Sequence, residues 1–228
     1  MPVEQITDDD IHFMPLKINE IFYSIQGESL YAGLPCVFIR LTGCNLRCAY
    51  CDTRYAYEEG TDMTIPEITD RVASYPAAAL VEITGGEPLF QEETADLVAA
   101  LLGQGRTVLM ETNGSLDISR TDSRCIRIMD IKCPSSRMDS HNDPGNFRRL
   151  EPHDQIKFII ETQTDYAFAL NILKLLPPDF PRSSVLFSPS FGTLPPRILA
   201  AWILRDGLGV RFHLQLHKLI WPDTERGV

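Results

Sequence analysis

The chain has no long apolar run and comparatively few basic side chains. A membrane-spanning helix requires about 18 consecutive apolar residues, and no stretch of this sequence approaches that length. The acidic beginning MPVEQITDDDIHF has no apolar segment of the kind that marks a secretory signal. Lysine and arginine number 21 against 31 aspartate and glutamate residues, a formal charge of −10, which argues against broad binding of nucleic acid or membrane surfaces. We therefore expect a cytoplasmic protein whose thiols stay reduced.

No low-complexity tract and no linker divides the 228 residues. The composition, 44% hydrophobic and 23% charged, is ordinary for a globular enzyme. A core of this size is stable without disulfide bonds. We expect a polar leader over residues 1–16 and a single domain over residues 17–228.

Short runs rich in Val, Ile and Phe alternate with helical patterns. The runs predict strands at Ile18–Ile25, Cys36–Leu41, Leu80–Thr84, Thr107–Glu111, Ile126–Ile131, Gln155–Ile160, Val185–Ser188 and Arg211–His217. Helices are predicted within TIPEITDRVASY, where Thr64 is the expected N-cap, and within EETADLVAALL, DYAFALNILKLL and PPRILAAWIL. The connections Asn113–Arg124 and Pro134–Pro152 show no such period and predict loops.

This alternation predicts parallel strand pairing and an α/β fold. The polar motifs follow several different strands, and chemistry gathers at the carboxyl ends of parallel strands. A partial β/α barrel of the TIM type explains this convergence better than an open sheet with one switch point. We therefore expect a modified, incomplete barrel with its site at the carboxyl ends of the strands.

The segment RLTGCNLRCAYCDT places Cys44, Cys48 and Cys51 at the spacing C-x3-C-x2-C. Three clustered thiols do not suit disulfide pairing, and a closed zinc site has four ligands. Cys36 and Cys125 fit the role of buried small apolar residues. Two interpretations of the three thiols remain open. One is a structural zinc site with Cys133 or a histidine as the fourth ligand, and the other is a 4Fe–4S cluster with one open iron.

The cysteine spacing resembles the signature of the radical S-adenosylmethionine (SAM) superfamily. The motif TGGEP at Thr84–Pro88 resembles that superfamily's site for the SAM amino group, and Gly85 and Gly86 would let a backbone approach a ligand closely. The resemblance implies that the three cysteines bind the cluster and that SAM occupies the fourth iron and yields a 5′-deoxyadenosyl radical. It also implies SAM contacts at Tyr50, Asp52, Gly86, Glu87, Asp130, Lys132, Ser135 and Ser188.

Three further motifs, FYSIQGES, FIRLTGC and QLHKLIW, resemble the 7-carboxy-7-deazaguanine synthase family. The resemblance extends from Lys17 to Trp221. It implies a radical SAM lyase of queuosine biosynthesis that converts 6-carboxy-5,6,7,8-tetrahydropterin to 7-carboxy-7-deazaguanine. The reaction loses ammonia and proceeds by hydrogen abstraction at C6 and ring contraction. The resemblance further implies Mg2+, a homodimer, and an electron donor such as flavodoxin or ferredoxin.

Several polar residues suit a carboxylated pterin. Arg40 offers a planar fork for the substrate carboxylate, and Gln215 and His217 would share one face of the predicted last strand. Together with the resemblance, this predicts substrate contacts at Ile25, Gln26, Gly27, Glu28, Arg40, Thr84, Gln215 and His217. Thr53 supplies a hard oxygen donor, and the resemblance makes it the expected Mg2+ ligand.

Two alternatives remain at this stage. An activase that makes a glycyl radical on a partner protein would share the cysteine spacing, but it gives no reason for Arg40 or for QLHK. A zinc-bound interaction module would use the thiols without catalysis. The segment PDTERGV follows Trp221, whereas some family members end close after the histidine, so the role of Pro222 is open.

Overall fold

The computed structural model describes residues 14–75 and 79–228, so most of the expected leader lies outside the described residues. The described strands form one sheet in the order β3-β1-β2-β4-β5-β6-β7-β8-β9. Their bounds are β1 (Leu16–Ile25), β2 (Pro35–Leu41), β3 (Thr61–Met63), β4 (Leu80–Gly85), β5 (Thr107–Thr112), β6 (Ile126–Asp130), β7 (Gln155–Ile160), β8 (Val185–Pro189) and β9 (Arg211–Phe212). From β2 onward the order follows the chain, without the reversal that creates a switch point.

The strands from β2 to β9 pair in parallel, as the alternation predicts. β1 differs because it pairs antiparallel with both β2 and β3. β3 was not predicted, since its sequence Thr-Asp-Met lacks the apolar pattern of a strand. The sheet order ends at β3 and β9, which do not pair with each other, so the barrel stays incomplete.

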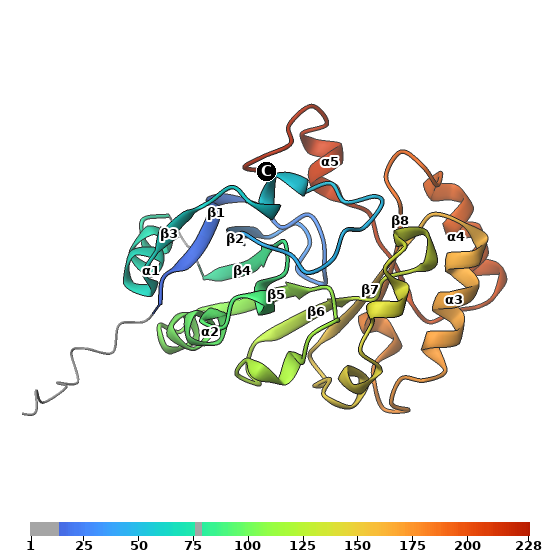
Figure 1. The fold of residues 1–228 in the computed structure, drawn as a ribbon. Helices are drawn as coiled ribbons and strands as arrows, with labels where there is room; N and C mark the ends of the chain where they lie inside the picture. The colour runs from blue at the N-terminus through green and yellow to red at the C-terminus, as the bar shows by residue number, and fades with distance from the viewer. Residues whose placement is uncertain (1–13, 76–78) are drawn as a thin grey trace, which may run out of the picture.

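The helices α1 (Ile65–Ala73), α2 (Thr94–Gly103), α3 (Gln163–Leu173) and α4 (Pro196–Arg205) cover the outer side of the sheet, whereas α5 (Leu216–Ile220) lies apart from them at the top of the view (Figure 1). Thr64 caps α1 as predicted, because its side chain accepts from the Glu67 amide while Glu67 bonds back to the Thr64 amide. Both predicted loops contain short 3-10 turns. Within the described residues, no helix has the length and apolarity to cross a membrane.

The predicted last strand is wrong in its second half. β9 ends at Phe212, and α5 begins at Leu216, where a strand was expected to continue to residue 217. The apolar alternation near the end of the chain resembles a strand, but the Leu216 amide donates to the Gly27 carbonyl oxygen at 2.9 Å. This bond draws the chain toward the loop after β1. Gln215 therefore caps α5 and His217 lies within it, so the predicted shared strand face does not exist.

The inner face of the sheet changes from apolar to charged along β4, β5 and β6. Residues near the strand starts form a small inner cluster of apolar side chains. Two positions further along, side chains on the same face are charged and line a cavity, as in the pairs Leu80 and Glu82, Leu109 and Glu111, and Ile128 and Asp130. The strand register thus places apolar side chains near the starts of these strands and charged, cavity-lining side chains near their carboxyl ends.

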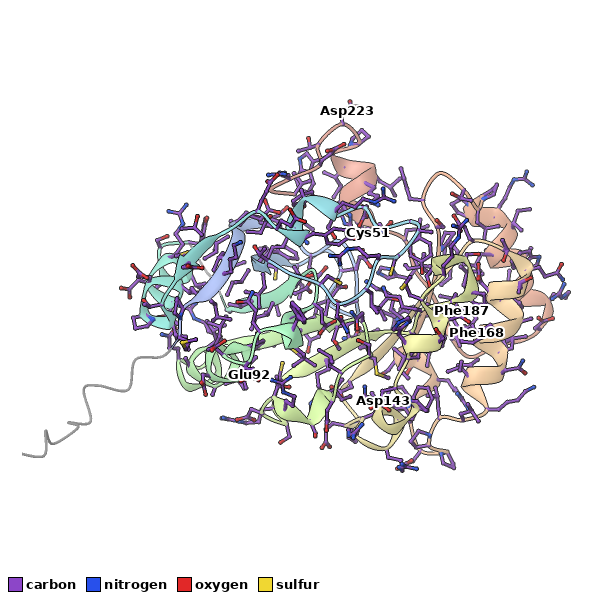
Figure 2. The ribbon with its side chains drawn as sticks, in the orientation of Figure 1. Cys51, Glu92, Asp143, Phe168, Phe187 and Asp223 are labelled. Carbon is purple, nitrogen blue, oxygen red and sulfur yellow. The ribbon has the colours of Figure 1, made fainter. Side chains whose placement is uncertain are left out.

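The larger core lies between the sheet and the helices. Phe187 of β8 makes edge contacts with Phe158 at 5.3 Å and with Tyr166 of α3 at 5.9 Å between ring centroids, and it is labelled in Figure 2. Such aromatic contacts add to the stabilisation from burial. Cys36 and Cys125 are fully buried, as predicted.

A buried ion pair joins the start of β6 to the segment before β7. Arg127 contacts Asp154 at 2.7 Å, with side-chain exposures of 2% and 0%. Arg127 also donates to the carbonyl oxygen of Ile118, and Asp154 accepts from the amide of Glu151. A buried pair contributes little net stability while intact, but loss of one partner leaves an uncompensated charge.

We predict that Asp154→Ala lowers the free energy of unfolding by about 3–5 kcal/mol, because Arg127 would stay buried without its carboxylate. Urea denaturation followed by circular dichroism measures the change. Asp122→Ala, which removes the partner of the exposed Arg124, is the control and should leave the midpoint unchanged. An unchanged midpoint for Asp154→Ala would contradict the prediction.

Candidate active site

A cavity of about 450 Å³ opens at the carboxyl ends of the parallel strands. Its walls come from the loops after β1, β2 and β4 to β8, and from the segment around α5. Of the predicted cluster, SAM and metal residues, it is lined by Cys44, Cys48, Tyr50, Cys51, Asp52, Thr53, Gly86, Asp130 and Lys132. Of the predicted substrate residues, it is lined by Ile25, Gln26, Gly27, Glu28, Arg40, Thr84, Gln215 and His217.

The three motif cysteines lie on one loop after β2, and Figure 2 labels Cys51 there, below α5 in the view. Their thiols are half-buried and line the cavity. The Cys44 sulfur accepts from the Leu46 amide at 3.4 Å and lies 4.0 Å from the Asn113 side-chain amide. Hydrogen bonds of this kind stabilise thiolate ligands.

The fourth cysteine of the zinc interpretation is unsuitable. Cys133 is fully buried outside the cavity lining, and burial raises the pKa of its thiol well above the usual value. Among residues 14–75 and 79–228, no three His, Cys, Asp or Glu side chains converge closely enough for a single metal ion. The thiolates of a 4Fe–4S cluster bind separate irons and need not converge on one point. The donor set therefore fits a cluster.

Gly85 and Gly86 allow two parts of the protein to approach each other. A Cβ atom at Gly85, whose φ is +142°, would lie 2.3 Å from the Leu41 carbonyl oxygen. A Cβ atom at Gly86 would lie 2.1 Å from the Gly43 carbonyl oxygen and 2.8 Å from the Cβ of Cys44. The close approach predicted for a ligand is therefore first a contact between the turn after β4 and the cysteine loop.

Glu87 does not face the cavity. Its carboxylate is fully buried and accepts from the Asn113 amide at 2.6 Å, the Thr112 hydroxyl at 2.8 Å and the Leu89 amide at 3.0 Å. These donors join the turn after β4 to the end of β5. Glu87 thus holds the turn after β4 against the end of β5, and its contact with SAM stays a prediction.

Two predicted serine contacts also lie away from the cavity lining. Ser135 donates its hydroxyl to Asp165 at 2.6 Å and its amide to the same carboxylate at 2.9 Å, which ties the turn after β6 to α3. Ser188 is fully buried inside β8. Ser190, which follows the end of β8, reaches the cavity instead. Ser188 pairs in register with Ile159, which lines the cavity, and its hydroxyl has no hydrogen-bond partner among the described residues. Contacts of Ser135 and Ser188 with SAM stay predictions.

The wall near the cysteines contains polar atoms without partners. The ammonium of Lys132 donates to Asp130 at 2.8 Å, as predicted. Burial would lower the pKa of Lys132, but Asp130 outweighs it, so the pKa lies above the usual value. Within the described residues, the other Asp130 oxygen and the Tyr50 hydroxyl are buried without hydrogen bonds. Such groups are costly unless a ligand or water completes them, so this wall suits a polar ligand.

A charged network that the sequence analysis missed lines the cavity next to this wall, with Lys157 paired in register with Asp130. Lys157 contacts Glu28 at 2.8 Å and Glu111 at 2.7 Å, and Gln26 donates to Glu82. The three missed residues, Glu82, Glu111 and Lys157, lie inside strands that otherwise read as apolar. A charge in the middle of an apolar strand is the signal that could have identified them, since it requires a buried partner.

The network shifts the pKa values of its carboxyl groups in opposite directions. Burial and the neighbouring Glu111 raise the pKa of Glu82 well above its usual value. Burial acts against ionisation of Glu28 too, but Lys157 and His217 outweigh it and lower its pKa. Burial thus favours the protonated form of Glu82, whereas Lys157 and His217 favour the charged form of Glu28. Burial also raises the pKa of Glu111, although Lys157 opposes this shift.

Arg40 is fixed at the cavity edge. Its Nε donates to Glu20 at 2.8 Å, and its guanidinium lies 5.8 Å from the ring centroids of both Phe22 and Tyr55. The terminal Nη nitrogens make no hydrogen bond with the described part of the chain. One edge of the guanidinium is therefore held by the protein, and the terminal nitrogens remain for a ligand.

Gly27 explains why α5 reaches the cavity. A Cβ atom at this position would lie 2.4 Å from Nδ1 of His217, so only glycine admits the helix here. Gln215 then donates to Glu28 at 2.8 Å, and Lys218 pairs with Asp52 on the cysteine loop. Gln215 and His217 thus line the cavity from a helix rather than from the predicted strand.

The segment after α5 turns back toward β1 (Figure 1). Arg226 contacts Glu59 at 2.9 Å and lies 4.2 Å from the Tyr55 ring centroid, and Val228 contributes to the cavity lining. The segment therefore covers the edge of the cavity that holds Arg40.

We predict that Cys48→Ala removes most of the bound iron and abolishes activity, because each motif thiolate would hold one iron of the cluster. Iron and sulfide analysis after anaerobic reconstitution, with the absorption spectrum, measures the loss. Cys125→Ala is the matched control and should keep its iron. Full iron loading in Cys48→Ala would show that the cluster ligands lie elsewhere.

Known proteins resemble this chain over most of its length. The model of the family described as the radical SAM superfamily matches residues 38–131. The 7-carboxy-7-deazaguanine synthase of Chlorobaculum tepidum is 49% identical over 220 residues, which cover 94% of this chain and 98% of the relative. That of Koribacter versatilis is 42% identical over 226 residues, covering 93% and 100%. The crystal structure of QueE from Escherichia coli has a TM-score of 0.75 at 23% identity, covering 88% of this chain and 94% of that one.

These likenesses decide between the open interpretations. The superfamily match confirms the 4Fe–4S cluster and SAM as cofactors, and the solved structure confirms the incomplete barrel. They favour a cluster-binding enzyme over the zinc-bound module, and the curated relatives favour a synthase over the glycyl-radical activase. With its signature cysteines gathered in one cavity, the chain belongs to the 7-carboxy-7-deazaguanine synthase family of radical SAM enzymes.

Proposed function

We propose that this enzyme converts 6-carboxy-5,6,7,8-tetrahydropterin to 7-carboxy-7-deazaguanine with loss of ammonia, by hydrogen abstraction at C6 and ring contraction. The observation that carries the proposal is that one cavity has the cluster cysteines in its wall together with Arg40 and the charged network. When bound, the cluster and SAM supply the 5′-deoxyadenosyl radical. The protein's own task is to hold the heterocycle against that wall in a fixed orientation.

The SAM side is formed by the wall near the cysteine loop. Lys132, fixed by Asp130, is suited to the SAM carboxylate, and the backbone of Gly86 and Tyr50 lies beside the cysteines. The unpartnered Tyr50 hydroxyl and Asp130 oxygen offer a polar ligand the hydrogen bonds that they lack. The ion pair of Asp52 with Lys218 closes this wall against α5.

The substrate carboxylate is assigned to Arg40. A guanidinium binds a carboxylate through two parallel hydrogen bonds, and its terminal nitrogens are available. Glu20 and the two aromatic rings hold the group in place before the substrate arrives, which reduces the entropy lost on binding.

The pyrimidine edge of the pterin is assigned to the loop after β1. Gly27 exposes backbone, Gln26 is held by Glu82, and Glu28 provides a carboxylate. Thr84, Gln215 and His217 complete the wall. This set accepts from N–H donors and donates to carbonyl oxygens, as a 2-amino-4-oxopyrimidine requires.

Thr53 is assigned to Mg2+. Its hydroxyl lines the cavity and lies 3.8 Å from the Cys51 sulfur. A single neutral hydroxyl is a weak ligand, so substrate oxygens and water would complete the octahedral shell. The ion would then orient the substrate, and its binding would depend on the substrate.

The proposal extends to the electron donor, the oligomeric state and the cellular location of the enzyme. A one-electron donor such as flavodoxin or ferredoxin would reduce the cluster through the cysteine loop, whose Arg47 and Ala49 are exposed. Residues 17–228 would act as one catalytic domain. A homodimer and a cytoplasmic location are part of the same proposal, since reduced thiols persist there.

The direct test is incubation of the reconstituted, reduced enzyme with SAM, Mg2+ and the carboxytetrahydropterin. Mass spectrometry should detect 7-carboxy-7-deazaguanine and ammonia, with SAM regenerated. Omission of the pterin is the control and should leave only slow SAM cleavage. A protein with full cluster content that yields no deazapurine would refute the proposed reaction.

We predict that Arg40→Ala weakens substrate binding by about 2–4 kcal/mol, because it removes a charge-assisted pair from a largely buried site. Steady-state kinetics with the carboxypterin and with a decarboxylated pterin measures the effect. The loss should be confined to the carboxylated substrate. Equal losses for both compounds would place the carboxylate site elsewhere.

We predict that Thr53→Ala retains the cluster and uncoupled SAM cleavage but turns over slowly and responds poorly to added Mg2+. The reason is that the hydroxyl oxygen is the proposed protein ligand of the ion. Titration of activity with MgCl2 measures the response, and Thr53→Ser, which keeps the hydroxyl, is the matched control. Wild-type stimulation of Thr53→Ala would assign the ion to other ligands.

A further inference from the structure

Lys157 occupies an unusual position on the inner face of the sheet. It is 4% exposed and projects from the run Gln-Ile-Lys-Phe-Ile-Ile of β7. Its ammonium lies 2.8 Å from Glu28, after β1, and 2.7 Å from Glu111, on β5. β6 separates β5 from β7 in the sheet, so one side chain joins three separate parts of the cavity wall.

The acids of this wall outnumber its cations. Glu82, Glu111 and Glu28 face one buried cation, and the acids lose solvation on burial. Glu28 and Glu111 both contact the single ammonium of Lys157, so that one group fixes the position of two carboxyl groups.

The open acceptor belongs to Glu111. Both oxygens of Glu28 are engaged, one by Lys157 and the other by Gln215. One oxygen of Glu111 binds Lys157, but the other has only the Thr84 hydroxyl at 3.5 Å. This oxygen lies in a cavity wall, so a ligand with adjacent N–H donors would find an oriented acceptor there.

We propose that Lys157 is a positioning residue that holds Glu28 and Glu111 in the orientation that selects the amino-bearing edge of a 2-aminopyrimidinone ring. Lys157 itself does not touch the ligand. The inference rests on the proposed function and deepens it, because it names the residue that makes the pocket specific for a pterin. Without the ammonium, the two carboxylates would repel each other and one would turn or take up a proton.

The test compares two ligands that differ only at the recognised edge. 6-Carboxypterin carries the 2-amino group, whereas 6-carboxylumazine has an oxygen in its place and keeps the carboxylate for Arg40. Dissociation constants are measured by fluorescence on the reconstituted enzyme, without turnover. Wild type should prefer the pterin by about 10-fold or more, and Lys157→Met should bind it about 30-fold more weakly and lose the preference.

Lys132→Met is the matched control, because it removes the other buried lysine of the cavity, which pairs with Asp130. It should weaken SAM binding and keep the preference for the pterin. A Lys157→Met enzyme that keeps the wild-type preference overturns the proposal.

Glu111→Gln is the second variant, and it decides the matter if Lys157→Met does not fold. It leaves Lys157 paired with Glu28 but replaces the open carboxylate oxygen, so the preference for the pterin should again be lost. Retention of the preference by Glu111→Gln overturns the inference, as does a wild type that binds both ligands equally. Selective pterin binding by a wild type that makes no deazapurine would refute the proposed reaction and leave the inference supported.

Discussion

The contact between the Gly85–Gly86 turn and the backbone after β2 determines the layout of the active site. Two chain segments approach each other there so closely that neither glycine could carry a Cβ atom. The Glu87 amide also donates to the Gly43 carbonyl oxygen at 2.8 Å. The turn thereby holds the start of the cysteine loop against the end of β4. The position of the thiols relative to the other strand ends follows from this contact.

Buried charge is the second constraint. The charged side chains lie between the inner apolar cluster and the opening of the cavity. Carboxylates and lysines in such a site must be paired, or must change their protonation state. Lys132 with Asp130 satisfies this on the SAM side, and Lys157 with two glutamates satisfies it on the substrate side. Each wall therefore has a fixed charge before any ligand arrives, which is the condition for electrostatic preorganisation.

The end of the chain completes the site by packing on its beginning. α5 can dock only because Gly27 has no side chain, and the ion pair of Lys218 with Asp52 then links α5 to the cysteine loop. The loop after β1, the loop after β2 and α5 are far apart in the sequence, yet each contributes to the same cavity. The last helix, α5, thus connects the substrate wall with the SAM wall.

The sequence by itself determined the strands other than β3 and the end of the predicted last strand, four of the helices, the α1 cap and the spacing of the thiols, because these depend on neighbouring residues and on a period. Its resemblance to a known family also indicated the cofactors. Only the tertiary structure decided that Glu87 binds the backbone of Asn113 and that His217 lies on a helix. It also revealed Lys157, since a buried charge is explained only by partners that are distant in the chain.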